Sequence, residues 1–416
     1  MAKSDYKYVI AGGGLAGASA IAGIREVDRD GAILLIGGEN HLPYDRPPLT
    51  KKLWFGKQKL EDITLHDRAW YENNGVELLL GAHAKELDAD RGALLVGQEL
   101  VLPERSRGAS CPGAGECRYE KLLLATGGTP RLLDIPGADL DGVCYYRTVD
   151  HYVKLRADVQ DGRAAVVVGG GFIGSELAAG LHTVGTKVTM VFRGTHLVPR
   201  VFPEGLGKAL QAKYQERGIA ILADDAPASF ERRNSTFVTQ TQKGQELQSD
   251  VLVVGAGITP STGLAGIAGL AIENGIVVNE CLETSHPGIY AAGDNANFPY
   301  QALGKRMRVE HWDNALNQGR YAGWNMAGRK QPYTYMPYFF SDLFEFGYEA
   351  VGDIDPSIQV VADWQKENEK GVLYFLQDGR VRGAMMCDVW DKVPAARELI
   401  ESGRQVTQDD LRGAIM

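Results

Sequence analysis

Residues Tyr8 to Gly17 read YVIAGGGLAG, and this stretch decides the fold of the first part of the chain. A short apolar run leads into the spacing G-x-G-x-x-G, with glycines at Gly12, Gly14 and Gly17. Between a strand and a helix, these glycines permit a tight turn, a close approach of backbone to a pyrophosphate, and close packing of the helix on the strand. The pattern predicts a dinucleotide phosphate at the N-terminus of the helix.

The flanking sequence completes a strand–helix–strand unit. We predict a buried strand over 8–11, a helix over 16–27 and a second strand over 32–36. Leu15 and Ala16 lie between the second and third glycines, within the same candidate phosphate loop. Glu39 stands 22 residues after Gly17, near the ~20 expected for an acid that binds an adenosine ribose.

A second unit of the same kind occupies residues 164–192. It has a strand over 164–168, a helix over 175–181 and a strand over 187–192. Its loop consists of Gly169, Gly170, Gly171, Phe172, Ile173 and Gly174. Two complete units in one chain predict two bound dinucleotides. The commonest chemical reason for such a pair is hydride transfer from a nicotinamide to a flavin.

Composition limits what these units can belong to. With 416 residues, 44% hydrophobic and 23% charged, the chain has ordinary globular values and room for two or three domains. The formal net charge of −9 argues against non-specific nucleic-acid or anionic-membrane binding. No apolar run reaches the ~20 residues of a membrane span. Five irregularly spaced cysteines and a polar start favour a cytoplasmic protein.

A rigid, proline-containing loop follows the first unit. Pro47 and Pro48 oppose a helix where they stand, and we expect one to begin at about Leu49. Such a loop would hold Lys51 in place, although a lysine taken alone is more often a solvated surface residue.

The next segment contains expected strands and a loop. Short antiparallel strands are predicted over 76–80, 93–96 and 99–102. Residues 103–118 are rich in Gly, Ser, Pro and Arg and contain Cys111 and Cys117. Two cysteines are too few for a closed zinc site, so we interpret this segment as a surface loop.

Two further strands end on turns. The strand over 121–125 ends at Ala125 and is followed by Thr126 and Gly127, a turn at which the backbone is again expected to approach a neighbouring group. The other ends at Gly293 and Asp294. Asp294 is placed either to bind a ribityl hydroxyl or simply to form a strand-end turn.

Taken in order, these motifs resemble the FAD-dependent pyridine nucleotide oxidoreductases, and within them the ferredoxin reductases and the apoptosis-inducing-factor group. The likeness covers nearly the whole chain. The run 46–51 is similar to the subfamily motif, with Thr50 where serine is usual. Residues 308–315 resemble the stretch that closes over the flavin, and 338–343 with 347–352 resemble the start of the apoptosis-inducing-factor C-terminal domain.

The resemblance implies roles for particular residues. In the related proteins the lysine at the position of Lys51 reaches the flavin N5 edge and pairs with a glutamate, which Glu176 matches. A cation there stabilises the negative charge that arrives with the hydride. Glu176 is also explicable as an acid favoured by a helix N-terminus. Further cofactor contacts are implied for Arg46, Ala125, Thr126, Gly127, Gly257, Gly293, Asp294, Glu310, His311 and Trp312.

The expected fold is α/β, with two Rossmann-like doubly wound nucleotide-binding domains and a C-terminal α+β domain. The FAD domain is expected over 1–125 and 245–325, the NAD(P) domain over 126–244 and the C-terminal domain over 326–416. Within the last of these we predict strands over 358–362, 371–376 and 381–386, followed by a helix over 393–401.

The choice of nicotinamide cofactor depends on the end of the second unit. It ends on Phe192 and Arg193 instead of the acid usual for NADH. Arg193 therefore favours NADPH slightly, unless it is a solvated loop residue.

Three functions stay open from the sequence. Residues 40–60 contain no cysteine, so disulfide reduction beside the flavin is not expected. The first function is a reductase of a small iron–sulfur carrier such as ferredoxin, which would dock on basic residues. The second is a nicotinamide-responsive switch that alters dimerisation or partner binding, with a homodimer as one assembly. The third is direct reduction of a small molecule such as a quinone. The candidate docking residues are Arg46, Lys51, Lys52, Lys57, Lys59, Lys305, Arg306 and Arg308.

Overall fold

The computed structural model describes residues 5–98, 115–159 and 162–415. By its internal contacts the chain forms two compact units. The first unit comprises Met1–Asp45, Glu61–Gly128 and Pro260–Pro337, and the second Arg46–Leu60, Thr129–Thr259 and Tyr338–Met416. The three functional domains expected from the sequence divide the chain differently and stay a prediction.

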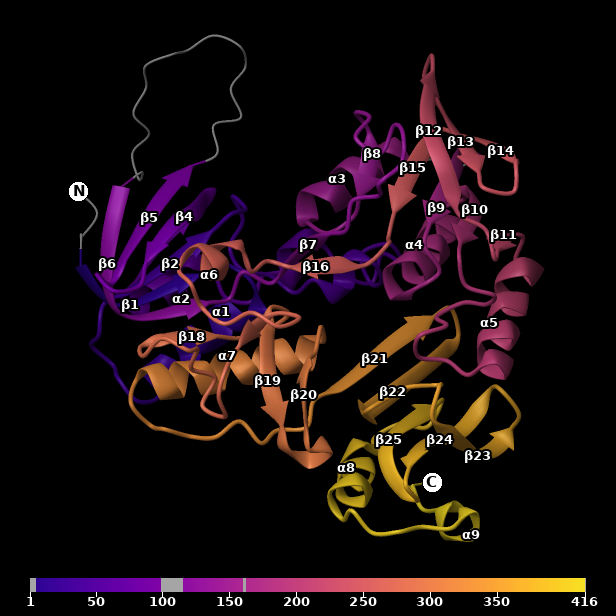
Figure 1. Cartoon of the computed structure of the whole chain (residues 1–416). Coiled ribbons are helices and arrows are strands. Elements are labelled where there is room, and N and C mark those ends of the chain that lie inside the picture. Colours follow the sequence, from indigo (N-terminus) through magenta and orange to yellow (C-terminus); the bar gives the residue numbers. More distant parts are fainter. Residues whose placement is uncertain (1–4, 99–114, 160–161, 416) are drawn as a thin grey trace. The chain divides into compact units, whose positions relative to one another are not determined.

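A seven-stranded sheet organises the first unit (Figure 1). Its parallel part pairs apolar strands in the order β3-β2-β1-β6, with β18 also paired to β6. The antiparallel strands β5 and β4 extend this sheet beyond β6. The bounds are β1 Asp5–Ala11, β2 Ile33–Gly37, β3 Val76–Leu80, β4 Ala82–Asp88, β5 Ala93–Gln98, β6 Gly115–Leu124 and β18 Ile289–Ala291.

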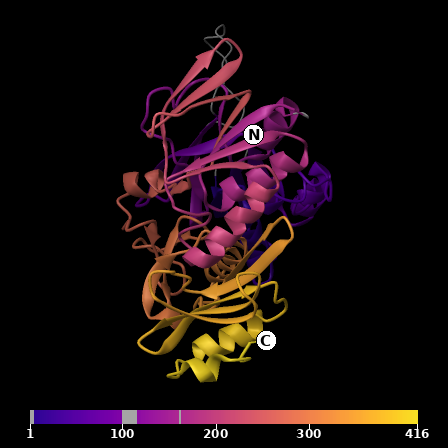
Figure 2. The same ribbon diagram turned by 90° about the vertical axis from the view of Figure 1, so that its right-hand side faces the viewer.

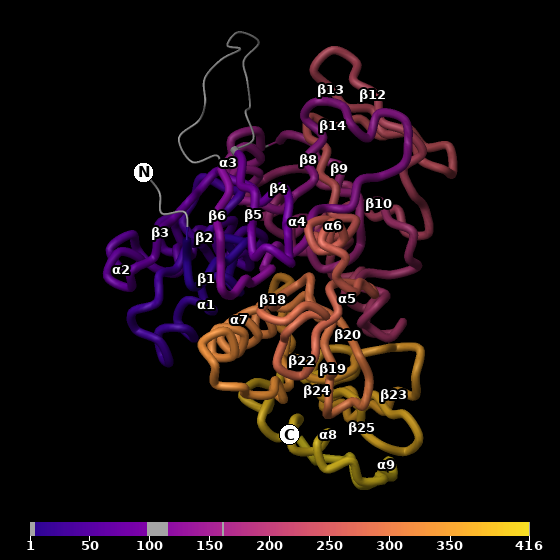
Figure 3. Tube along the Cα trace, turned by 60° about the vertical axis from the view of Figure 1, so that its left-hand side comes forward, coloured from indigo at the N-terminus to yellow at the C-terminus, as the bar shows by residue number. Residues whose placement is uncertain are grey.

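Helices α1 (Leu15–Arg25) and α7 (Trp312–Met326) pack backbone against backbone in this unit. A Cβ at Gly319 would lie 2.2 Å from the carbonyl oxygen of Ala16, and one at Gly23 would lie 2.2 Å from that of Arg320. Side chains at these positions would force the two helices apart. Helix α7 also contacts β18 (Figure 3).

Smaller elements complete the first unit. They are the helices α2 (Arg68–Asn73) and α6 (Gly263–Ile267), the 3₁₀ turns η2 (Leu60–Ile63) and η3 (Gln301–Leu303), and a sheet of β17 (Ile276–Val277), β19 (Ala296–Tyr300) and β20 (Lys305–Arg308). The chain crosses between the two units five times: after Asp45, after Leu60 within η2, after Gly128 within β7 (Gly128–Pro130), after Thr259 within β16 (Ile258–Pro260) and after Pro337.

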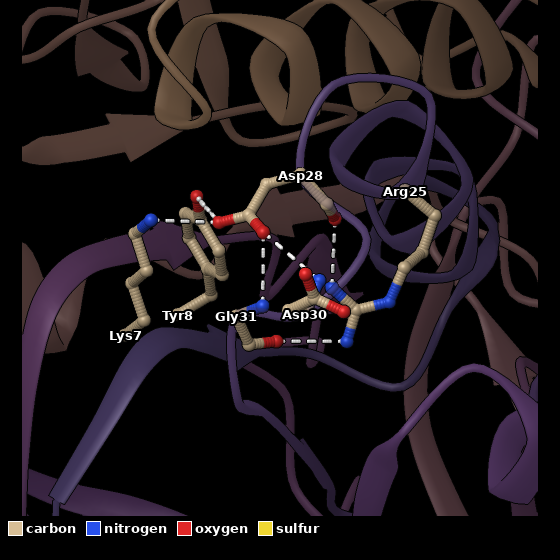
Figure 4. A network of polar contacts seen from close by, with 6 residues as sticks. All are labelled: Lys7, Tyr8, Arg25, Asp28, Asp30 and Gly31. Atoms are coloured by element: carbon tan, nitrogen blue, oxygen red, sulfur yellow. Dashed lines mark hydrogen bonds and ion pairs between the residues drawn. The ribbon is translucent and has the colours of Figure 1, made fainter.

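The turn between α1 and β2 is held by a polar network (Figure 4). The Asp28 carboxylate accepts hydrogen bonds from Lys7 Nζ at 2.7 Å, Tyr8 Oη at 2.8 Å and the backbone N–H groups of Asp30 and Gly31. Arg25 donates to the carbonyl oxygens of Asp28 and Gly31. These hydrogen bonds link the last turn of α1 to β1 and to the residues that lead into β2.

Three expectations for residues 49–118 need correction. The strand Val76–Leu80 pairs parallel with β2, and the antiparallel strands are β4, β5 and β6. Cys117 is buried within β6 and does not lie in a loop, whereas Cys111 and the expected strand 99–102 fall outside the described residues. Instead of a helix beginning at Leu49, a 3₁₀ turn, η1 (Pro47–Leu49), is followed by further turns.

A five-stranded parallel sheet in the order β11-β10-β9-β15-β8 forms the nucleotide-type part of the second unit. Val, Ile and Leu dominate it because both faces are covered. The strands are β8 Val143–Tyr145, β9 Ala164–Val168, β10 Lys187–Phe192, β11 Ala220–Ala223 and β15 Val251–Val254; the helices are α3 Val149–Asp158, α4 Phe172–Thr183 and α5 Glu204–Glu216. An antiparallel sheet adds β12 (Pro227–Arg233), β13 (Thr236–Thr241) and β14 (Glu246–Ser249).

The C-terminal segment of this unit is an antiparallel sheet with helices beside it (Figure 2). Its order is β21-β22-β25-β24-β23, and its core contains buried Tyr348, Tyr374 and Phe375. The elements are β21 Tyr338–Leu343, β22 Phe346–Gly352, β23 Gln359–Lys366, β24 Lys370–Gln377, β25 Arg380–Cys387, α8 Val393–Glu401 and α9 Gln408–Leu411. The expected α+β character of this segment is confirmed.

Candidate cofactor and hydride-transfer site

The first fingerprint forms a cradle at the N-terminus of α1. Gly12 has φ +135°, and a Cβ there would lie 2.0 Å from the carbonyl oxygen of Ala125. At Gly14, by contrast, a Cβ would have no atom of the described chain within 4 Å, and no described side chain caps the helix. N–H groups at the start of a helix that lack a side-chain cap suit an anion. The residues present therefore fit a dinucleotide pyrophosphate.

The second fingerprint repeats this geometry in the second unit. Gly169 has φ +120° and lies against the carbonyl oxygen of Gly255, while Gly174 lies against that of Gly169. A Cβ added at Gly171 would meet nothing within 4 Å in the described ranges, and α4 begins without a side-chain cap from them. This loop also fits a pyrophosphate.

Glu39 follows the end of β2 and is held by a neighbouring tyrosine. The hydroxyl of buried Tyr44 donates to its carboxylate at 2.6 Å. The residue after this tyrosine, Asp45, accepts a hydrogen bond from the indole of Trp312 at 2.7 Å. Glu39 therefore has a fixed carboxylate at the strand end where an adenosine ribose is expected.

Asn295, which the sequence interpretation missed, joins the ends of β6 and β18. Its fully buried side-chain amide donates to the carbonyl oxygen of Leu124 at 3.1 Å and to the Thr126 hydroxyl at 2.9 Å. The N–H of Gly293 donates to Gln318 of α7 at 2.9 Å. These hydrogen bonds join the turn at 125–127 to the turn at 293–294, which contains Asp294. The Gly-Asp-Asn sequence was the signal that could have found Asn295.

The residues that lead into α7 carry charges and a neutral histidine. Arg308 forms an ion pair with Glu310 and donates to the carbonyl oxygen of Asp294 at 2.8 Å. Burial lowers the pKa of His311 to about 4, against a smaller opposing effect of Asp294. The imidazole is therefore uncharged at neutral pH.

Lys51 and Glu176 form a buried ion pair in the second unit. Lys51 Nζ lies 3.2 Å from Glu176 Oε1, and each residue is only 6% exposed. The ammonium also lies 4.6 Å from the centre of the Phe340 ring and 3.4 Å from the Phe340 carbonyl oxygen. This geometry excludes a solvated Lys51, and it removes Lys51 from the candidate docking residues.

Two hydroxyl groups complete the surroundings of the Glu176 carboxylate. Thr50 Oγ1 donates to Oε2 and Ser341 Oγ donates to Oε1, each at 2.5 Å. Thr50 and the ion-pair partner Lys51 lie in the turn after η1 and Ser341 lies in β21, whereas Glu176 lies in α4. Ser341 was missed because it lies 165 residues away in the chain. The sequence interpretation recognised the segment 338–343 that contains Ser341, but it did not predict the contact of Ser341 with Glu176.

At the end of β10, an aromatic ring stands where NADH sites usually have an acid. A Cβ at Gly170 would lie 2.5 Å from the ring of buried Phe192. The following loop folds back, since the N–H of Val198, at φ +52°, donates to the Gly170 carbonyl oxygen at 2.7 Å. Arg193 and Arg200 of this loop are exposed.

The candidate residues divide between the two units. Arg46 lies in the second unit and donates to the carbonyl oxygen of Arg147 at 2.8 Å. The first unit holds Gly12, Gly14, Leu15, Ala16, Gly17, Glu39, Ala125, Thr126, Gly127, Gly293, Asp294, Glu310, His311 and Trp312; the second holds Arg46, Lys51, Gly169, Gly171, Phe172, Ile173, Gly174, Glu176, Arg193 and Gly257.

The chain belongs to the pyridine nucleotide-disulphide oxidoreductase family, which matches residues 6–319. It is an oxidoreductase of this family, whose ferredoxin reductase members use FAD and NAD(P)H. Residues 322–369 match the C-terminal domain of the mitochondrion-associated apoptosis-inducing factor. The resemblance found in the sequence motifs is confirmed.

Relatives of two kinds are similar over almost the whole chain. Apoptosis-inducing factor 1 of Dictyostelium discoideum is 34% identical, over 97% of this chain and 79% of that protein. The ferredoxin–NAD(+) reductase component of the anthranilate 1,2-dioxygenase system of Burkholderia cepacia is 31% identical, over 95% and 94%.

Solved structures agree with the fold. The ferredoxin reductase for the CYP199A2 system of Rhodopseudomonas palustris has a TM-score of 0.88 at 28% identity, over 98% of this chain and 97% of that chain. The reductase of the covalent putidaredoxin reductase–putidaredoxin complex gives 0.87 at 27% identity, over 98% and 95%. Within the described ranges, no helix is long and apolar enough to cross a membrane, and no three metal-ligating side chains cluster.

Proposed function

We propose that this protein takes a hydride from NAD(P)H onto FAD and passes electrons singly to a small iron–sulfur carrier such as a ferredoxin. The carrying observation is the buried Lys51–Glu176 pair in a chain whose residues 40–60 contain no cysteine. FAD, when bound, supplies the conversion from two-electron to one-electron transfer. The names of the Burkholderia relative and of the putidaredoxin reductase support a protein carrier.

The residues take the following roles in this proposal. The first fingerprint, Glu39 and the two strand-end turns bind FAD, and the second fingerprint binds the nicotinamide dinucleotide. Lys51 presents a fixed cation to the charge that arrives with the hydride, and Glu176 keeps that cation in one geometry and offsets the cost of its burial.

Anaerobic rapid mixing of the flavin-loaded protein with NADH or NADPH, followed by addition of a [2Fe–2S] ferredoxin, tests this function. We expect fast bleaching of the flavin absorbance and fast return of that absorbance when the ferredoxin is added. Bleaching that is slow with both nucleotides, or a reduced protein that ignores the ferredoxin, would contradict it.

We further propose a preference for NADPH, which rests on the loop after β10. Phe192 cannot accept hydrogen bonds from ribose hydroxyls, and exposed Arg193 and Arg200 supply positive charge suited to a 2′-phosphate. The acids that follow β11 already have partners. Asp224 forms an ion pair with Lys243, and Asp225 accepts a hydrogen bond from the N–H of Ala226.

Arg193→Ala should raise the Kd for NADPH about tenfold and leave the Kd for NADH within twofold, because one charge-assisted phosphate contact is lost. Fluorescence titration measures both constants. Lys187→Ala, which removes an exposed cation at the opposite end of β10, serves as the matched control. Equal changes for both nucleotides would contradict the assignment.

The match of 322–369 to the apoptosis-inducing-factor C-terminal domain favours a second candidate function, a nicotinamide-responsive switch. It predicts slow turnover with every acceptor, including quinones, and a long-lived reduced complex. Light scattering with and without NAD(P)H tests the homodimer that such a switch would control.

We also propose that the protein is cytoplasmic, as expected from its cysteine content. Fractionation of cells tests this location.

A further inference from the structure

Ser341 lies in the segment that matches the apoptosis-inducing-factor C-terminal domain, and its hydroxyl donates directly to Glu176 at 2.5 Å. Ser341 is 1% exposed. It lies in the middle of β21, where it pairs with Tyr348 of β22. The preceding residue, Phe340, provides both the ring and the carbonyl oxygen that contact Lys51. Two successive residues of β21 thus contact both members of the ion pair.

The carboxylate needs these donors for a physical reason. A buried carboxylate is stable only when its oxygens are paired and hydrogen-bonded. Lys51 forms an ion pair with Oε1, Ser341 donates to Oε1, and Thr50 donates to Oε2. Hydroxyl donors fix the orientation of the carboxylate without adding a second positive charge, so Lys51 stays the one cation in contact with it among the described residues.

We propose that Ser341, together with Thr50, is a positioning residue for hydride transfer: it orients Glu176, which in turn orients Lys51. The segment at 322–369 therefore contributes to the chemistry of the reductase as well as to its fold. This inference rests on the proposed function of Lys51.

Ser341→Ala tests the proposal, with Ser175→Ala as the matched control. Ser175 is fully buried beside Glu176 in the same helix, but its hydroxyl has no hydrogen-bond partner within the described chain. In the flavin-loaded protein, we expect Ser341→Ala to slow the limiting rate of flavin bleaching by NADPH about tenfold, because misplacement by less than about 1 Å is costly. The Kd for NADPH should change less than twofold. Ser341→Thr should restore most of the rate, and Ser175→Ala should match wild type.

A second measurement does not depend on activity. Competitive acetylation of the purified full chain, analysed by mass spectrometry, reports how firmly the Lys51 ammonium is held. Ser341→Ala should raise the acetylation rate of Lys51 severalfold relative to Lys187, and Ser175→Ala should not.

The outcomes separate the two proposals. Unchanged bleaching and unchanged Lys51 acetylation in Ser341→Ala would overturn the positioning role. A parallel loss of rate, NADPH affinity and thermal stability, without rescue by Ser341→Thr, would also overturn it in favour of a structural role. If wild-type protein were not reduced by either nucleotide, the proposed reductase function would fail, and the acetylation result would still decide whether Ser341 positions Lys51.

Discussion

The Glu176 side chain neutralises a cation that the fold has removed from water. Glu176→Leu should lower the free energy of unfolding by about 3 kcal/mol, because it leaves the Lys51 ammonium buried without its counter-charge. Urea unfolding of the purified protein measures this change.

The double variant Lys51→Met with Glu176→Leu is the control for that prediction. It removes both charges, and we expect it to regain at least half of the lost stability. A double variant no more stable than Glu176→Leu alone would contradict this explanation.

His311 should make stability depend on pH. Burial lowers its pKa to about 4 in the folded protein, while the unfolded chain protonates it near the ordinary value of 6.5. Between those values the unfolded state binds the extra proton, so the free energy of unfolding falls as pH decreases from about 7 to 4, by roughly 3 kcal/mol.

Comparison with His311→Gln isolates this effect, because burial also lowers the pKa of His66. Urea unfolding at several pH values should give a shallower decline for the variant than for wild type between about pH 7 and 4. Parallel curves would assign the decline to other groups.

The connection between α1 and β2 depends on one carboxylate, Asp28 (Figure 4). Its hydrogen bond from Lys7 is the largest cause that lowers the pKa of Asp28 far below the usual range. Asp28→Ala should reduce stability at neutral pH by about 1–3 kcal/mol, because it leaves several hydrogen-bond donors of a partly buried turn without their acceptor.

The sign of the pH effect follows from the lowered pKa. Asp28 contributes its stability above about pH 4, and the contribution is lost as pH falls further. The difference in unfolding free energy between wild type and Asp28→Ala should therefore shrink below about pH 4. Asp30→Ala is the control, because Asp30 joins the network through its backbone N–H. A difference that persists undiminished in strong acid would contradict this account.

The proposed docking of a ferredoxin depends on how charge is distributed over the surface of the molecule. The net charge is −9, so an acidic ferredoxin needs a local basic region. Exposed Lys52, Lys57 and Lys59 in the loop after η1 supply one next to Lys51 in sequence. Changing all three to Glu should slow ferredoxin reduction about tenfold at low salt and weaken its salt dependence, with flavin bleaching by NADPH unchanged.

The matched control changes three other exposed lysines of the second unit, Lys154, Lys187 and Lys370, to Glu. Both triple variants have the same net charge, so only the location differs. Equal slowing in the two variants, measured by stopped flow with ferredoxin, would show that net charge and not a docking site matters.

The sequence was sufficient to predict those elements whose structure depends on residues close together in the chain. The glycine loops at 12–17 and 169–174 were predictable because positive φ or backbone contact demands glycine at Gly12, Gly17, Gly169 and Gly174. Strand β10 and helix α8 were predicted to the residue, since apolar runs and periodicity are short-range signals.

Partners that are distant in the chain were not predictable in this way. Strand β3 was expected to be antiparallel, but its run of apolar residues does not encode which strand lies beside it. Asn295 stands in a Gly-Asp-Asn sequence, but that sequence does not show that its side chain reaches Thr126. Ser341 has no distinctive sequence context, and it becomes a candidate residue only because the fold brings it to Glu176.

The amino-acid sequence alone therefore predicted two dinucleotide-binding units and a flavin-dependent chemistry without redox cysteines at 40–60. Its resemblance to a known family implied the pairing of Lys51 with Glu176. The folded chain was required to show that this lysine is buried, that two hydroxyls fix its carboxylate partner, and that one of them comes from β21. The physical reason is that burial and hydrogen bonding depend on all segments that meet at a point, whereas glycine spacing and hydrophobic period depend on neighbours in sequence.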